Sequence, residues 1–256
     1  MFSRNPRCIY RKNQLGEVIC QLRFPRILTI GTTVPAPFQE AIRQEFPRFA
    51  VIDERPRAAV NQPQEPIVPM RNYQFASQDG VWRVNLTDNF LSLTCSRYTD
   101  WEHFAKMLDK PLAAFIKLYQ PAFFQRIGLR YLNFISRQDL DLEDTPFREL
   151  MEKRYLGILA EPDLEDAAVN RSTIDAEFAI TAGCRAKIHA GPGRVRRGGK
   201  EESELKFIFD LDLSKSGEMP VIHSAGILQT LHDQAFPIFR GAITSVLHNA
   251  MEPEHL

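Results

Sequence analysis

The clearest alternation of apolar and polar residues lies in the middle of the chain, over residues 123–135. Read with a period of two, one face of this segment is apolar and consists of Ile127, Leu129, Tyr131 and Ile135. The opposite face carries two cations around a glycine, namely Arg126, Gly128 and Arg130. The pattern predicts a central strand, apolar on one side and cationic on the other.

Two groups of three alternating segments flank the predicted central strand in sequence. The apolar positions of the first group are Tyr73, Phe75, Trp82, Val84, Leu86, Leu91, Leu93 and Cys95, with turn residues at 78–80 and 88–89. The second group alternates over residues 173–181, 184–189 and 204–213. Short connections of this kind predict antiparallel meanders.

Each group of strands is followed by a helical stripe that contains a proline. Thr99 and Glu102 form a predicted capping box for the first helix, and the second helix is expected to begin near Ser224. The first stripe consists of Phe104, Met107, Leu108, Leu112, Phe115, Ile116 and Tyr119. The second consists of Ile227, Leu228, Leu231, Ala235, Phe239, Ala242, Ile243 and Val246. Pro111 and Pro237 should kink these helices, because proline lacks the amide that a helix interior needs.

The remaining segments are less regular. Residues 16–24 alternate as a strand, and Pro35 and Pro37 open a helix with its stripe at Phe38, Ile42 and Phe46. Residues 53–69 hold four prolines and predict a stiff exposed loop. A short helix is expected near residues 147–151.

Together these elements predict an α+β fold of long antiparallel strands, with two meanders around the central strand packed on two long Pro-kinked helices. The 256 residues lack a clear mid-chain linker, which favours a single domain over residues 1–256. The repeated order of three strands and a helix also suggests an internal duplication with halves 1–136 and 137–256. No residue-level identity between the halves supports that interpretation.

The composition of the chain bears on nucleic-acid binding, on the redox compartment and on membrane insertion. The chain has 32 basic and 32 acidic residues, whereas a general nucleic-acid binder normally shows a basic excess. Its four cysteines, Cys8, Cys20, Cys95 and Cys184, have neither metal-ligand nor redox spacing, so we expect reduced, buried thiols in a cytosolic protein. No segment has the length and hydropathy of a membrane span, and residues 1–12 do not resemble a secretory signal.

Three segments together carry a family resemblance. They are Asn13-Gln14-Leu15-Gly16-Glu17-Val18 with Leu22-Arg23-Phe24, Pro37-Phe38-Gln39 with Ile42-Arg43 and Phe46-Pro47, and Arg126-Ile127-Gly128-Leu129-Arg130-Tyr131-Leu132-Asn133. The chain resembles a sporadically distributed prokaryotic family of proteins of similar length that has no assigned function. The resemblance therefore implies no activity or catalytic residue. A patchy distribution is common among accessory and defence-linked genes.

The charged strand faces are the first candidate site. Six of their residues are chosen as ligand-binding: Arg126, Arg130, Glu177, Lys187, Lys206 and Asp210. The same faces also hold Asp175, Arg185, His189, Glu204 and Asp212. One interpretation is a solvated outer sheet surface with cross-strand ion pairs. The other is a groove in which Gly128 leaves open space for an anion held by both arginines.

The glycine- and arginine-rich segment 191–200 is the second candidate. It lacks the Gly-Lys-Ser/Thr of a phosphate-binding loop, so we expect an exposed hairpin tip. Its cations could contact phosphate or an acidic partner and are Arg194, Arg196, Arg197 and Lys200.

No catalytic motif is recognisable: the six histidines form no metal-binding pair, and there is no nucleophile elbow. The leading hypothesis is a non-catalytic binding protein without cofactor or metal, whose partner is an anionic small molecule or an acidic protein. The first alternative is an enzyme for a phosphorylated small molecule, with Glu177 or Asp210 as base or metal ligand. The second is nucleic-acid binding through residues 194–200. Self-association is compatible with each.

Overall fold

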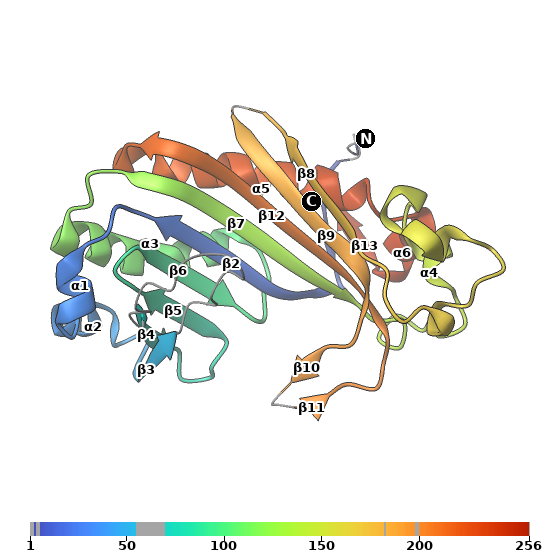
Figure 1. The fold of residues 1–256 in the computed structure, drawn as a ribbon, viewed down its shortest axis with the longest axis horizontal. Coiled ribbons are helices and arrows are strands. Elements are labelled where there is room, and N and C mark those ends of the chain that lie inside the picture. The colour runs from blue at the N-terminus through green and yellow to red at the C-terminus, as the bar shows by residue number, and fades with distance from the viewer. Residues whose placement is uncertain (1–2, 4–5, 55–69, 182, 198–199, 256) are drawn as a thin grey trace, which may run out of the picture. The chain divides into compact units, whose positions relative to one another are not determined.

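The computed structural model describes residues 3, 6–54, 70–181, 183–197 and 200–255 (Figure 1). Of the Pro-rich loop predicted over residues 53–69, residues 55–69 lie outside these ranges. The predicted α+β class is confirmed. Nine described strands form one sheet in the order β3-β4-β5-β6-β2-β7-β12-β9-β8. Their bounds are β2 (Leu15–Arg23), β3 (Arg48–Glu54), β4 (Met70–Ala76), β5 (Trp82–Leu86), β6 (Phe90–Cys95), β7 (Phe124–Ile135), β8 (Ile174–Ala179), β9 (Cys184–Gly193) and β12 (Lys206–Met219).

The other described elements are short strands and helices. Two antiparallel pairs are β1 (Cys8–Tyr10) with β13 (Pro253–His255), and β10 (Arg196–Arg197) with β11 (Lys200–Glu201). The helices are α1 (Leu28–Thr32), α2 (Ala36–Ile42), α3 (Trp101–Tyr119), α4 (Phe147–Leu150), α5 (Ser224–Arg240) and α6 (Ser245–Ala250). Single 3-10 turns are η1 (Lys153–Tyr155), η2 (Gly157–Ala160), η3 (Asp166–Ala168) and η4 (Val221–His223). None of the described helices combines the length and hydropathy needed to cross a membrane.

The chain divides into two compact units, each built from separated segments. Unit 1 comprises Met1–Val18, Leu129–Lys215 and Leu228–Leu256. Unit 2 comprises Ile19–Gly128 and Ser216–Ile227. These units do not coincide with the halves 1–136 and 137–256, because each unit takes residues from both of them.

Unit 2 contains the first meander, which α3 covers. The apolar positions predicted for β4, β5 and β6 are buried, and Trp82 of β5 lies 5.8 Å from Phe104 of α3, measured between ring centroids. The helix begins one residue later than predicted. Asp100, not Thr99, is its N-cap, and the Asp100 carboxylate accepts the backbone N–H of His103 at 2.7 Å. A carboxylate suits this position because it also meets the positive end of the helix dipole.

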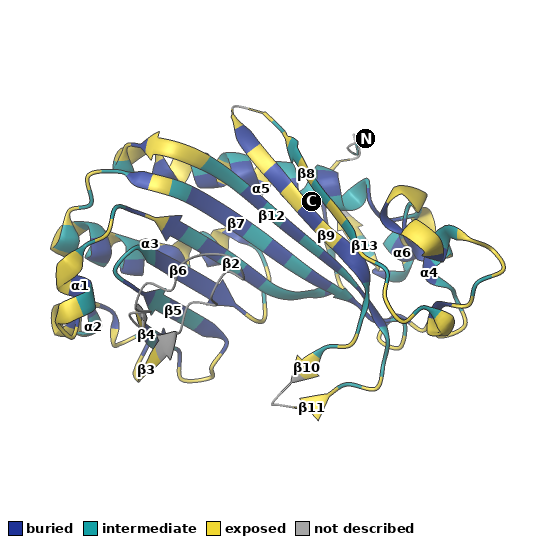
Figure 2. Cartoon of the chain, viewed as in Figure 1, coloured by how far each residue is buried: buried dark blue, intermediate teal, exposed yellow. Residues whose placement is uncertain are grey.

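Unit 1 contains the second meander, with β9 between β8 and β12 (Figure 2). One face is apolar, and its buried residues are Ala186, Ile188, Ala190, Phe207, Phe209, Leu211 and Leu213. Helix α5 packs on this face, where Phe239 lies 5.9 Å from Phe209. Most positions on the opposite face are partly or fully exposed, as the period of two predicts, although Lys206 and Gly191 are buried.

The prediction of one closing helix that reaches Val246 is wrong. Helix α5 ends at Arg240, and Gly241 follows it. Glycine commonly terminates helices because it tolerates the backbone conformations that follow the last turn. Helix α6 then begins at a new N-cap, where the Thr244 hydroxyl accepts the N–H of Leu247 at 3.5 Å. Val246 is 42% exposed and lies outside the core.

The segment predicted as the loop 191–200 is partly strand. Gly191, Pro192 and Gly193 belong to β9 and align with residues of β12. Proline is tolerated here because the pairing of β8 with β9 reaches only Ala190, which leaves the far edge of Pro192 without a neighbouring strand. The exposed hairpin is therefore shorter than predicted and is formed by β10 and β11.

Candidate functional site

Charged residues of unit 1 form a row across β8, β9 and β12. The strand register aligns Asp175 with His189, and His189 with Asp210. Residues two apart on a strand share a face, so the next row repeats the arrangement. Each row therefore places one basic side chain between two carboxylates. In the second row, Lys187 aligns with Glu177 on one side and with Asp212 on the other.

Arg130 on β7 continues the first row through a two-point ion pair with Asp210. Its Nε donates to Oδ1 at 2.7 Å, and its Nη2 donates to Oδ2 at 2.5 Å. The Asp210 carboxylate raises the pKa of the Arg130 guanidinium above its ordinary value. This geometry is the preferred one for arginine and carboxylate, and it fixes the guanidinium plane. No further bond from Nη1 of Arg130 is found among the described residues.

His189 is oriented by Asp175. Nδ1 of His189 lies 2.9 Å from Oδ1 of Asp175. An ionised carboxylate can only accept, so Nδ1 carries the proton of this bond. In the neutral imidazole Nε2 is then left as an acceptor. Both side chains are solvated, at 51% exposed for His189 and 60% for Asp175.

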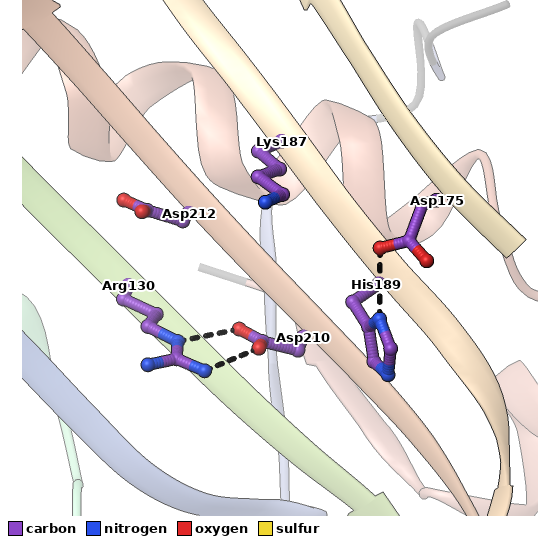
Figure 3. Close-up of a pocket in the computed structure, with 6 residues that line it drawn as sticks. All are labelled: Arg130, Asp175, Lys187, His189, Asp210 and Asp212. Carbon is purple, nitrogen blue, oxygen red and sulfur yellow. Dashed lines mark hydrogen bonds and ion pairs between the residues drawn. The ribbon is translucent and has the colours of Figure 1, made fainter. Parts of the chain in front are cut away.

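These side chains line an open pocket of about 380 Å³ on the charged face (Figure 3). The six lining residues are Arg130, Asp175, Lys187, His189, Asp210 and Asp212. Three of them, Arg130, Lys187 and Asp210, were selected from the sequence as ligand-binding. Because all six belong to unit 1, the pocket lies within a single compact unit.

Lys187 differs from the other cations on this face. No ion pair or hydrogen bond of its ammonium group is found in the part of the chain that the structure describes. Arg185 on the same strand, by contrast, pairs with Glu177 at 2.7 Å. The pocket therefore presents one uncommitted ammonium and one partly committed guanidinium. Such donors can hold a carboxylate or a phosphate.

The pocket does not resemble a metal centre. No group of three or more His, Cys, Asp or Glu side chains placed to hold a metal ion is found among the described residues. Asp210 has both carboxylate oxygens bonded to Arg130, so it is not available as a metal ligand.

The other residues selected from the charged faces lie elsewhere. Arg126 belongs to unit 2, and the expected open space over Gly128 is filled there: a Cβ at Gly128 would strike the Arg126 guanidinium. Lys206 has a side chain only 9% exposed and pairs with Glu202 at 2.7 Å and with Glu204 at 3.6 Å. Its charge is therefore used within unit 1.

The basic segment forms a small hairpin with internal partners. Arg196 lies 3.5 Å from Glu201, and Nε of Arg194 donates to the Ser203 carbonyl at 3.4 Å. Arg197 and Lys200 are register partners in β10 and β11. Glu201, which follows the segment, thus offsets part of its charge.

Three pocket residues were on the predicted charged faces but were not selected as ligand-binding: Asp175, His189 and Asp212. The alternating pattern assigned these residues to the charged face of the sheet. Only the strand register reveals that His189 lies between two acids. A register cannot be read from one strand at a time. Comparison with models of known protein families found no match to this chain, and neither did a search of curated proteins.

Proposed function

We propose that this protein is a non-catalytic binding protein and that the pocket of unit 1 holds the anionic group of a small molecule. The supporting observation is Lys187, whose ammonium faces the pocket without an ion pair in the described residues. Arg130, which also lines the pocket, is the second cation. Phosphate and carboxylate are the groups that such donors recognise.

The exposure of the pocket favours binding over catalysis. Catalytic charge stabilisation depends on a site from which water is excluded, because water screens the interaction. Here His189 and Asp175 are each more than half exposed. The four cysteines are free and buried, which agrees with the reducing cytosol in which we place the protein. A role in an accessory or defence-linked system rests on the family resemblance alone.

Isothermal titration would test the proposal. Wild type and the variant Lys187→Met are titrated with inorganic phosphate and with a panel of phosphorylated and carboxylated metabolites. Loss of the uncommitted ammonium should weaken binding by about tenfold, the effect of one charged hydrogen bond. Lys117→Met on α3 is the matched control, because Lys117 is exposed and belongs to unit 2. Equal affinities in wild type and Lys187→Met would contradict the proposal.

The second candidate is an enzyme that acts on a phosphorylated small molecule. The Asp175–His189 bond favours it, since a histidine fixed at Nδ1 presents Nε2 as a general base. The variant His189→Gln separates the two functions. Under the enzyme hypothesis it abolishes turnover of a bound phosphorylated compound, whereas a binding protein shows no turnover before or after the change.

Macromolecular partners remain weaker candidates. An acidic protein or a nucleic acid would contact the β10–β11 hairpin, but Arg196 already lies near Glu201. Nucleic-acid binding through this hairpin would fall steeply with salt concentration, which a binding assay at two salt concentrations detects.

A further inference from the structure

Strand β3 of unit 2 is an edge strand that exposes apolar side chains. Among the described strands it pairs with β4 alone, and it stands first in the strand order of the sheet (Figure 1). Phe49, Val51 and Ile52 are 41%, 47% and 43% exposed. Single exposed apolar residues are common on proteins. Edge strands, however, are usually protected by charges, proline or a covering segment, because their unpaired backbone groups can pair with another chain.

The apolar face of the sheet continues out to this edge. Phe49 aligns with the buried Phe75 of β4, and the two ring centroids lie 5.3 Å apart. Val51 lies two residues further along β3 and shares this face, whereas Ile52 points to the other face. A further strand beside β3 would pair with its outward N–H and C=O groups and would cover Phe49 and Val51.

The charges at the two ends of β3 favour antiparallel pairing with a second copy of the same strand. Arg48 is the first residue of the strand and Glu54 is the last. A twofold axis through Val51 aligns Arg48 of each copy with Glu54 of the other, since both residues are equally distant from Val51 in sequence. Opposite charges at facing positions stabilise paired strands, whereas parallel pairing in register would place like charges together.

We propose that β3 is the interface of a homodimer, in which the β3 strands of two copies pair antiparallel and continue the sheet across a twofold axis. Such an interface is isologous, because each copy contributes the same residues. Main-chain hydrogen bonds hold a strand added to a sheet edge, and the side chains select its partner and register. The inference concerns unit 2 and does not depend on ligand binding in the pocket of unit 1.

Sedimentation equilibrium over a series of protein concentrations tests the inference. Wild type should show a reversible equilibrium between monomer and dimer. Val51→Lys brings two ammonium groups together at the twofold axis and should raise the dissociation constant of the dimer about tenfold or more. Lysine is a common residue on edge strands, so the variant should fold, which its melting temperature checks. Ile222→Lys is the matched control, because Ile222 is 84% exposed and lies in unit 2 outside β3.

A charge exchange tests the antiparallel register and also decides the matter if Val51→Lys is unstable. Arg48→Glu should weaken the dimer, because it faces Glu54 of the other copy, and the double variant Arg48→Glu, Glu54→Arg should restore it. A wild type that stays monomeric at every concentration, or a dimer that Val51→Lys leaves as tight as before, would overturn the inference. Equal weakening by Ile222→Lys, or a double variant no tighter than Arg48→Glu, would overturn it as well.

Discussion

Arg130 and Asp210 join β7 to β12 through two charge-assisted hydrogen bonds, of 2.7 Å and 2.5 Å. The Asp210 side chain is only 14% exposed, whereas that of Arg130 is 43% exposed. The guanidinium thus compensates the charge of a mostly buried carboxylate. The ion pair should therefore stabilise unit 1, and both of its residues also line the pocket.

A double-mutant cycle would measure this pair. Arg130→Met leaves the Asp210 carboxylate without its partner, which should lower the free energy of unfolding by about 1–3 kcal/mol. Asp210→Asn in addition should recover part of that loss, which gives a coupling energy of about 1–2 kcal/mol. Chemical denaturation of the four proteins supplies the numbers.

The Arg185–Glu177 pair is the matched control for the cycle. Its side chains are 68% and 52% exposed, and one hydrogen bond of 2.7 Å joins them. An exposed pair of this kind contributes about 0.2–1 kcal/mol. A coupling energy for Arg130 and Asp210 no larger than that of this control would show that the second hydrogen bond and the burial of Asp210 add nothing to the pair.

Gly191 is required by close backbone packing. A Cβ at this buried position of β9 would strike the carbonyl oxygen of Ser172, and a backbone atom cannot move aside as a side-chain end can. Gly191→Ala should therefore destabilise the protein by about 1–3 kcal/mol. The melting temperature measures the effect.

The same substitution at Gly226 should have the opposite effect on stability. This glycine is exposed on α5, and a Cβ there meets no atom within 4 Å. Alanine should stabilise the helix by about 0.5–1 kcal/mol. If Gly191→Ala and Gly226→Ala both melt at the wild-type temperature, the carbonyl oxygen of Ser172 does not exclude a side chain at residue 191.

His232 should make stability depend on pH. It is 4% exposed on α5; Nδ1 lies 2.7 Å from the Tyr131 hydroxyl, and Nε2 contacts the Arg7 guanidinium. Burial, followed by the Arg7 charge, lowers the pKa of His232 from 6.5 to about 3. Below pH 6.5 the unfolded chain binds a proton that the folded protein does not.

The contribution of neutral His232 to the free energy of unfolding is therefore complete above pH 6.5. It is lost as the pH falls toward 3, by up to about 1.4 kcal/mol per pH unit. Denaturation curves between neutral and weakly acidic pH measure the slope. His232→Gln removes the titrating group and should flatten it. The same slope in both proteins would mean that other groups cause the acid sensitivity.

Phe115 anchors α3 to the core of unit 2. Its side chain is fully buried, and its ring centroid lies 4.5 Å from that of Phe24. Phe115→Ala should lower the free energy of unfolding by about 3–5 kcal/mol, because it leaves a cavity at a fully buried position. Leu118→Ala on the same helix is the control: Leu118 is 40% exposed, and its loss should change stability by less than about 0.5 kcal/mol. Comparable losses at both positions would contradict this packing.

Local periodicity was sufficient to predict most of the fold. The alternation over residues 123–135 corresponds to β7. Of the seven residues in the predicted stripe of α3, Phe104, Leu108 and Phe115 are buried, and the other four are partly buried. Element ends were less predictable, because capping depends on single side chains such as Asp100 and Thr244. The proposed internal duplication has no support in the two units.

The candidate site was only partly predictable, for a physical reason. A period of two assigns a residue to a face but not to a neighbour on the next strand. His189 was placed on the charged face, yet its position between Asp175 and Asp210 follows from the register. The Arg126 side chain likewise lies over Gly128 by a rotamer choice that the sequence pattern does not encode.

Chemical-shift mapping by NMR tests the central claim most directly. Labelled protein is titrated with the compound of the panel that binds most tightly, and shifts are followed in both units. We expect saturable changes centred on Arg130, Lys187 and His189, with Lys187→Met reducing them. Changes confined to the β10–β11 hairpin, or a complete absence of saturable changes at these three residues, would contradict the account.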